Sequence, residues 1–267
     1  LTLGMRWTRD SKDYESAVFE ADGSPSLVCA DPNTRDVFGS GACTAGVPAS
    51  ATVAALERTL SKSWSSVTPR VALDYQLADD KMVYTSVSKG FKSGSFDGRE
   101  VGTALYNLQP IEPETVYAYE IGAKAEWLDN RLRSNLAVFF NDFQDLQGTG
   151  TDQQTGALTR FSVGDVETKG VELEIVAEPI RNLSITGNIG FLETKFTTIN
   201  FDQVADCGPV GTGTQALQLK FSPKVSSFLA ANYHIPLAGE RGAITVGADW
   251  TRKSSFYHSS CNPLPTQ

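Results

Sequence analysis

The feature that most constrains the fold is a hairpin of strictly alternating side chains. From residue 119 to 127 apolar residues occupy every second position, with polar residues or glycine between them, and after a three-residue turn the alternation resumes through residue 140. Successive side chains of a strand point to opposite faces, so one side of this hairpin is apolar and the other is charged. The apolar side must cover either a protein core or the hydrocarbon of a membrane.

The same alternation recurs along the chain and predicts an all-β, antiparallel fold. The expected strands are 1–9, 62–77, 81–89, 115–127, 131–147, 160–178, 183–196, 217–235 and 242–252. Apolar residues take a helical spacing only in 52–61, inside a long connection, and this spacing predicts a short loop helix.

The connections between these strands alternate in length. The links at 78–80, 128–130, 179–182 and 236–241 are tight, whereas 10–61, 90–114, 148–159 and 197–216 are long and polar. An up-and-down meander would collect all tight turns at one end, as in outer-membrane β-barrels. Several strands are also longer than the roughly five or six residues usual in globular sheets. Aromatic residues near the strand ends, such as Trp127, Trp7 and Trp250, fit the girdles of a membrane barrel.

Alternation alone does not separate this barrel from a soluble β-sandwich whose apolar face is buried inside. We therefore keep two alternatives: a soluble extracellular β-sandwich that binds glycans, and an outer-membrane barrel or adhesin without transport. The sandwich predicts an apolar face shielded from its surroundings.

Composition excludes several other classes. A net charge of -8 argues against a nucleic-acid partner. No apolar run is long enough for a membrane-spanning helix, and no basic leader precedes Leu1, so we expect no signal peptide here.

The sequence also contains no residue pattern that supports a catalytic or metal-binding site. The two histidines, His234 and His258, are not spaced for a metal site or a catalytic triad, and Ser86 to Lys89 matches an S-x-x-K motif only within a predicted strand. The four cysteines lack the C-x-x-C spacing of zinc sites, so disulfides in an oxidising compartment are favoured over metal ligation. We expect no enzyme activity, no metal and no cofactor.

Four sequence pieces carry a family resemblance. They are P-R-V-A-L-D-Y at 69–75, S-x-G-F-K-S-G at 88–94, P-E-T-V-x-x-Y-E-I-G-x-K at 113–124 and T-K-G-V-E-L-E at 168–174. In this order and spacing they resemble the barrel domain of TonB-dependent outer-membrane receptors, over nearly the whole chain.

The resemblance implies a 22-stranded barrel with an N-terminal plug inside it. Because the chain offers only nine strands, no plug and no terminal aromatic strand, residues 1–267 are expected to be an internal part of the transmembrane β-barrel domain, with the plug and the C-terminal strands absent. The implied function is TonB-dependent active uptake of a scarce ligand, such as an iron-siderophore complex, across the outer membrane of a Gram-negative bacterium. The implied partners are outer-membrane lipid and lipopolysaccharide, the TonB complex through an N-terminal region, and the small-molecule ligand.

The resemblance also assigns residues to roles. The expected lumen-facing residues are Glu120, Lys124, Glu126, Arg133, Asn135, Glu172 and Glu174. The expected ligand contacts lie in or beside the long loops and are Lys92, Ser93, Phe96, Arg99, Asn141, Asp142 and Gln144. Of the three possible cysteine pairings, Cys29–Cys43 with Cys207–Cys261 is favoured, because Cys29 and Cys43 share one long loop.

Overall fold

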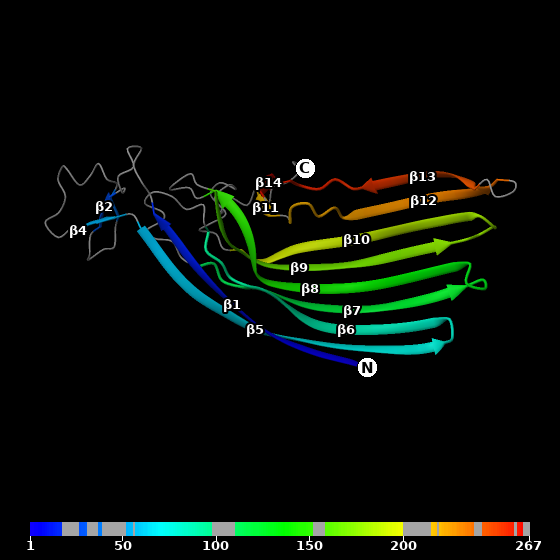
Figure 1. Cartoon of the computed structure of the whole chain (residues 1–267), viewed down its shortest axis with the longest axis horizontal. Coiled ribbons are helices and arrows are strands. Elements are labelled where there is room, and N and C mark those ends of the chain that lie inside the picture. The colour runs from blue at the N-terminus through cyan, green and yellow to red at the C-terminus, as the bar shows by residue number, and fades with distance from the viewer. Residues whose placement is uncertain are drawn as a thin grey trace.

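Nine long strands form a single antiparallel sheet (Figure 1). The computed structural model describes residues 1–17, 27–30, 37–38, 52–55, 57–97, 110–151, 158–199, 215–217, 219–237, 242–258 and 261–263. In spatial order the strands are β1 (Thr2–Ala17), β5 (Glu57–Ala78), β6 (Lys81–Lys92), β7 (Glu114–Trp127), β8 (Leu132–Thr151), β9 (Leu158–Ala177), β10 (Leu183–Ile199), β12 (Val225–Pro236) and β13 (Ala243–Lys253). Apart from short inserted strands, spatial order equals chain order, so the sheet is the expected up-and-down meander.

Two small sheets accompany the large one. They are β3 (Val37–Phe38), β2 (Leu27–Ala30) and β4 (Thr52–Ala55) in one, and β11 (Gln215–Leu217) with β14 (Cys261–Pro263) in the other. The predicted helix over 52–61 is wrong, since this stretch forms β4 and the beginning of β5. Residues 57–60 of β5 pair with residues 14–17 of β1, and this backbone ladder outweighs the local helical spacing.

The strand ends that the tight links join all lie at one end of the sheet, on the right in Figure 1, and the strand ends from which the long connections start lie at the other. The tight turns join β5 to β6, β7 to β8, β9 to β10 and β12 to β13. Residues with left-handed backbone form two of them: Leu128, Asp129 and Asn130 have φ of 56°, 54° and 65°, and Asn182 has φ of 68°. Asn and Asp tolerate this conformation better than most residues, which explains their place in these turns. We call the two ends the tight-turn end and the long-loop end.

One face of the sheet is apolar and uncovered. The strand register aligns Ile121, Val138, Val171, Phe191 and Val225 across β7 to β12 in one continuous row. The first four of these side chains are 60%, 44%, 38% and 50% exposed. Among the described residues no second sheet or helical layer packs on this apolar face, which contradicts the soluble-sandwich alternative.

The few buried apolar residues lie elsewhere. Within the described ranges they are Trp64, Ile111, Phe161 and Val166, near the long-loop end of the sheet. No helix in the described part of the chain is both long and apolar enough to cross a bilayer. In the same part, β1 and β13 each pair along one edge only, so the sheet is open at both sides.

Candidate functional site

The opposite, polar face of the sheet carries a ladder of paired side chains. Arg133 donates through Nε and Nη2 to Glu126 Oε1, at 3.0 and 2.9 Å. Asn135 Nδ2 donates to Glu174 Oε2 at 3.2 Å. The register places all seven residues expected in a lumen on this one face: Glu120, Lys124, Glu126, Arg133, Asn135, Glu172 and Glu174.

Glycines on this face make room for aromatic rings. A Cβ atom at Gly122 would lie 2.5 Å from Cε1 of Tyr84, and one at Gly170 would lie 2.5 Å from Cζ of Phe139. Each ring therefore covers a glycine on the neighbouring strand. Such contacts help to fix the register of β6 with β7 and of β8 with β9. Lys124 Nζ lies 5.6 Å from the centre of the Tyr84 ring, a cation–π contact that further orders the face.

A segment of the long connection between β6 and β7 folds back onto the sheet at the long-loop end. Ser95 and Ile111 exchange backbone hydrogen bonds of 3.2 and 2.7 Å. Gln147 Nε2 on β8 donates to the carbonyls of Ser93 and Glu112, at 3.1 and 3.0 Å. We call residues 93–97 with 110–113 the mouth segment. The mouth segment is therefore hydrogen-bonded to β8 and between its own two halves.

Cationic and aromatic side chains fasten the mouth segment to β1 and β5. Lys12 Nζ donates to the Gly94 carbonyl at 2.7 Å, and Lys62 Nζ lies 2.6 Å from Glu112 Oε1. The Phe96 ring centre lies 6.0 Å from that of Trp64, which is only 5% exposed. The Phe96 ring centre also lies 5.9 Å from that of Tyr14, with the two rings tilted by 40°.

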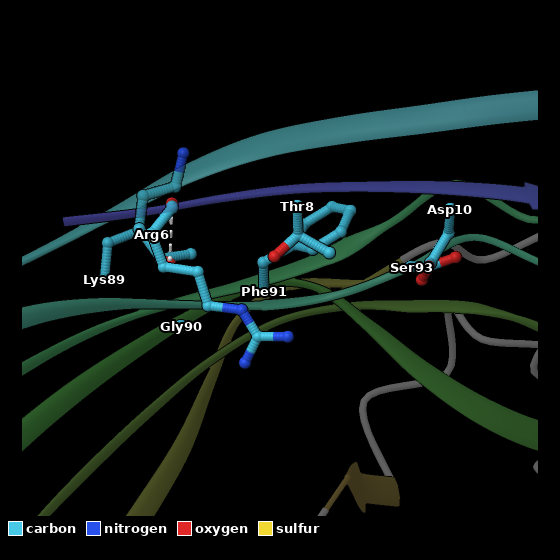
Figure 2. A pocket seen from close by; sticks show the side chains of 8 residues that line it. Arg6, Thr8, Asp10, Lys89, Gly90, Phe91 and Ser93 are labelled. Atoms are coloured by element: carbon cyan, nitrogen blue, oxygen red, sulfur yellow. Dashed lines mark hydrogen bonds between the residues drawn. The ribbon is translucent and has the colours of Figure 1, made fainter.

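A pocket of about 410 Å³ opens beside the mouth segment (Figure 2). Its lining comes from β1, β5, β6 and the mouth segment and consists of Arg6, Thr8, Asp10, Thr68, Lys89, Gly90, Phe91 and Ser93. The Thr68 hydroxyl donates to the Arg6 carbonyl at 3.2 Å, which ties the two strands together below the pocket. Within the described residues the Arg6 guanidinium forms no ion pair and no hydrogen bond. We call this the Arg6 pocket.

The structure separates the residues expected to contact a ligand. Ser93 lines the Arg6 pocket, and the Phe96 ring contacts those of Trp64 and Tyr14. Lys92 Nζ lies 3.2 Å from Glu114 Oε2, so its charge is paired. Asn141 Nδ2 donates to Thr168 Oγ1 at 3.1 Å on the polar face.

The register places two further residues that were expected to contact a ligand, Asp142 and Gln144, on the apolar side of the sheet. Asp142 pairs with Tyr117, and Gln144 with Thr115, in the rows of the apolar face rather than in that of Asn141. Arg99 lies outside the described residues. Asn141 and Asp142 are neighbours in sequence, so strand alternation alone already implied that they could not share a face.

Sequence reasoning missed most of the Arg6 pocket. Arg6, Thr8 and Asp10 alternate with apolar Met5 and Trp7, so their common face was readable from the first strand. Their proximity to Ser93 and Gly90 was not, because it depends on β1 pairing with β5 and on the folded mouth segment.

The predicted disulfides involve cysteines whose side chains lie outside the described part of the structure, so both pairings stay predictions. Among the described side chains no group of His, Cys, Asp and Glu could hold a metal ion.

Comparison with known proteins decides the family. The family model for the β-barrel of TonB dependent receptor-like proteins matches residues 1–266. This chain belongs to the TonB-dependent receptor β-barrel family. With its uncovered apolar face, the chain is part of an outer-membrane protein of a Gram-negative bacterium.

Relatives of known sequence are named as siderophore receptors. The ferric-pyoverdine 358 receptor of Pseudomonas putida is 24% identical over 205 residues, which cover 75% of this chain and 22% of the relative. The probable TonB-dependent siderophore receptor PiuA of Acinetobacter baumannii is 28% identical over 152 residues, or 55% of this chain and 20% of the relative.

A solved structure agrees on the fold. The ferric yersiniabactin uptake receptor FyuA from Yersinia pestis superposes with a TM-score of 0.60 at 19% identity, over 80% of this chain and 29% of that one. The chain thus spans about a fifth to a third of the length of the receptors that it matches.

Proposed function

We propose that this chain forms part of the wall of a receptor that imports an iron-siderophore complex across the outer membrane, driven by the TonB system. The observation that carries the proposal is the barrel-family match over residues 1–266 on a sheet with one uncovered apolar face and one paired polar face. The names of the sequence relatives support a siderophore as the ligand class.

In this proposal the polar face lines the lumen and the apolar face contacts lipid. Unpaired strand edges are not stable in hydrocarbon, so β1 and β13 require neighbouring strands to close a barrel. Other parts of the intact receptor would supply these strands, together with a plug in the lumen and the region that contacts TonB. The ladder from Glu126 and Arg133 to Asn135 and Glu174 would then meet water or the plug.

The Arg6 pocket is the best-placed ligand contact in the described wall. It lies on the polar face at the long-loop end, which is the extracellular end in outer-membrane barrels. A guanidinium that pairs with no described residue can donate two parallel hydrogen bonds to a carboxylate, or a single charge-assisted hydrogen bond to a phenolate oxygen. Thr8, Asp10 and Ser93 add hydroxyl and carboxylate groups that would orient the ligand. No bond is made or broken, so we propose a transporter without enzymatic activity.

Uptake of radiolabelled iron by cells that express the intact receptor tests this function. Cells would receive a panel of ferric siderophores under iron limitation, with and without a functional TonB gene. We expect TonB-dependent uptake of at least one siderophore. Uptake of none, with the receptor correctly inserted in the membrane, would favour the alternative of a barrel without transport.

The same assay tests the pocket. Arg6→Gln should raise the half-saturating ligand concentration about tenfold, because a charge-assisted hydrogen bond is lost. Arg70→Gln is the matched control, since Arg70 lies on the same face of the neighbouring strand but does not line the pocket. Equal effects of the two substitutions would reject the pocket while leaving import itself intact.

A further inference from the structure

The Arg6 pocket carries opposite charges at its two ends. Figure 2 shows the Arg6 guanidinium at one end and the Asp10 carboxylate at the other, with Thr8 between them. All three residues belong to β1, where side chains two residues apart point to the same face. Because a strand rises about 3.3 Å per residue, the α-carbons of Arg6 and Asp10 are about 13 Å apart. The pocket is therefore polarised along the strand.

Neither of these two charges forms an ion pair with a described residue. Asp10 is half-buried, and the ammonium of Lys12, two residues farther along the same face, donates instead to the Gly94 carbonyl at 2.7 Å. Lys89 also lines the pocket, but its ammonium lies 5.8 Å from the centre of the Tyr117 ring, in a row of the apolar face. Within the described part of the chain, the pocket thus keeps one guanidinium and one carboxylate available to a ligand.

Hydroxyl groups lie along the pocket between the two charges. Thr8 and Ser93 are both half-buried lining residues. The Ser93 hydroxyl donates to the Gly94 carbonyl at 2.9 Å, which leaves its oxygen able to accept a hydrogen bond. The Thr8 hydroxyl forms no hydrogen bond with a described residue, so it can donate or accept. A ligand that spans the pocket would meet neutral hydrogen-bonding groups between two opposite charges.

The size of the pocket limits what it can hold. Its volume of about 410 Å³ is near the lower end of the range of small-molecule sites. We therefore assign to it one arm of a ferric siderophore and not the whole complex.

We infer, resting on the proposed import function, that the Arg6 pocket selects a zwitterionic siderophore arm, whose carboxylate pairs with Arg6 and whose protonated amine pairs with Asp10. A ferric tris-catecholate complex is anionic and would bring negative charge against the Asp10 carboxylate. An uncharged trihydroxamate complex would remove water from both charges without replacing it by a partner. The ligand class is thus a chelator built from amino acids that keeps one carboxylate and one amine free of the iron.

A matched series of four ferric chelates tests the ligand class. All four share one trihydroxamate iron core with one flexible arm. The arm carries a free carboxylate and a free amine, or has the carboxylate amidated, the amine acetylated, or both groups capped. Quenching of the tryptophan fluorescence of the intact receptor would give the four dissociation constants. The zwitterionic chelate should bind most tightly, and each cap should weaken binding about tenfold, because one charge-assisted hydrogen bond is lost.

Substitutions connect each charge of the ligand to one residue. Arg6→Gln should weaken the zwitterionic chelate about tenfold and leave the carboxylate-amidated chelate unchanged. Asp10→Asn should also weaken the zwitterionic chelate about tenfold, but leave the amine-acetylated chelate unchanged. Arg9→Gln and Asp13→Asn are the matched controls, since each lies three residues farther along β1, on its opposite side and outside the pocket. Neither control should alter binding of any of the four chelates.

The inference is overturned if the four chelates bind equally, if none of them binds, or if Arg6→Gln weakens the amidated and zwitterionic chelates alike. The comparison of ligands on the parent receptor decides the question even if a variant does not insert. Uptake separates this inference from import itself. TonB-dependent uptake of iron from tris-catecholate or uncharged chelates alone would reject the zwitterionic arm and keep the importer, whereas uptake from no siderophore would reject the importer.

Discussion

Replacing Val138 with arginine should destabilise the membrane-inserted protein by about 2–4 kcal/mol, because a charge would enter hydrocarbon. Val138 lies on the apolar face between Ile121 and Val171, and its side chain is 44% exposed. Its neighbours on this face are exposed as well, and a continuous exposed apolar face of this size is the feature that lipid would cover.

The magnitude follows from the depth of Val138. The apolar stretch of β8 from Leu132 to Phe140 rises about 26 Å along the strand, which spans about 20 Å of depth at a tilt of about 40°. Leu136 is at the midpoint, so Val138 lies about 5 Å from the midplane. Arginine costs about 2–4 kcal/mol at the midplane and at most about 1 kcal/mol near the interfaces. We therefore expect a value in the lower half of that range.

Asn135 on the same strand provides the control. Its side chain is on the polar face, where Asn135 Nδ2 donates to Glu174 Oε2. Asn135→Arg places the same charge beside a carboxylate, and Asn135→Ala removes one partly exposed hydrogen bond, so both should cost less than about 1 kcal/mol. Equilibrium unfolding of the intact receptor from lipid vesicles in urea would give all three values. Similar costs for arginine at positions 138 and 135 would refute the assignment of the two faces.

Further substitutions test local features of the wall. Gly122→Ala should cost about 1–3 kcal/mol by crowding the Tyr84 ring, and Tyr84→Ala in the same chain should remove most of that cost in the same unfolding assay. Gln147→Ala removes the two side-chain hydrogen bonds from Gln147 to the mouth segment, so amide exchange at Ser95 and Ile111, which pair within that segment, should accelerate while exchange in β7 stays constant. The two predicted disulfides should leave no reactive thiol in the denatured, unreduced protein, and detection of four thiols would reject them.

Strand alternation predicted the fold well because it is a local property. The face on which a side chain such as Ile121 lies follows from strand alternation alone. The alternation of short and long connections predicted the up-and-down order of the strands. The nine predicted strands all occur, although β1 and β5 extend farther beyond the apolar band than expected. The strand predicted from residue 217 begins at Val225, with a turn at residues 220–221 before it.

Non-local contacts set the limits of sequence reasoning. The helix predicted over 52–61 failed because backbone pairing with β1, some 40 residues away in the chain, outweighs apolar spacing. The Arg6 pocket required three strands and the mouth segment to meet, and no single segment encodes that meeting.

Spin labels placed singly at positions 137 and 138 of the intact receptor, in lipid vesicles, would test the orientation of the sheet most directly. Ala137 pairs with Gly122 and Glu172 on the polar face, whereas Val138 pairs with Ile121 and Val171 on the apolar face. Collision with oxygen, which concentrates in hydrocarbon, should dominate at position 138, and collision with a water-soluble nickel complex should dominate at position 137. The reverse pattern, or equal access of both reagents at both positions, would contradict a membrane wall with its apolar face in lipid.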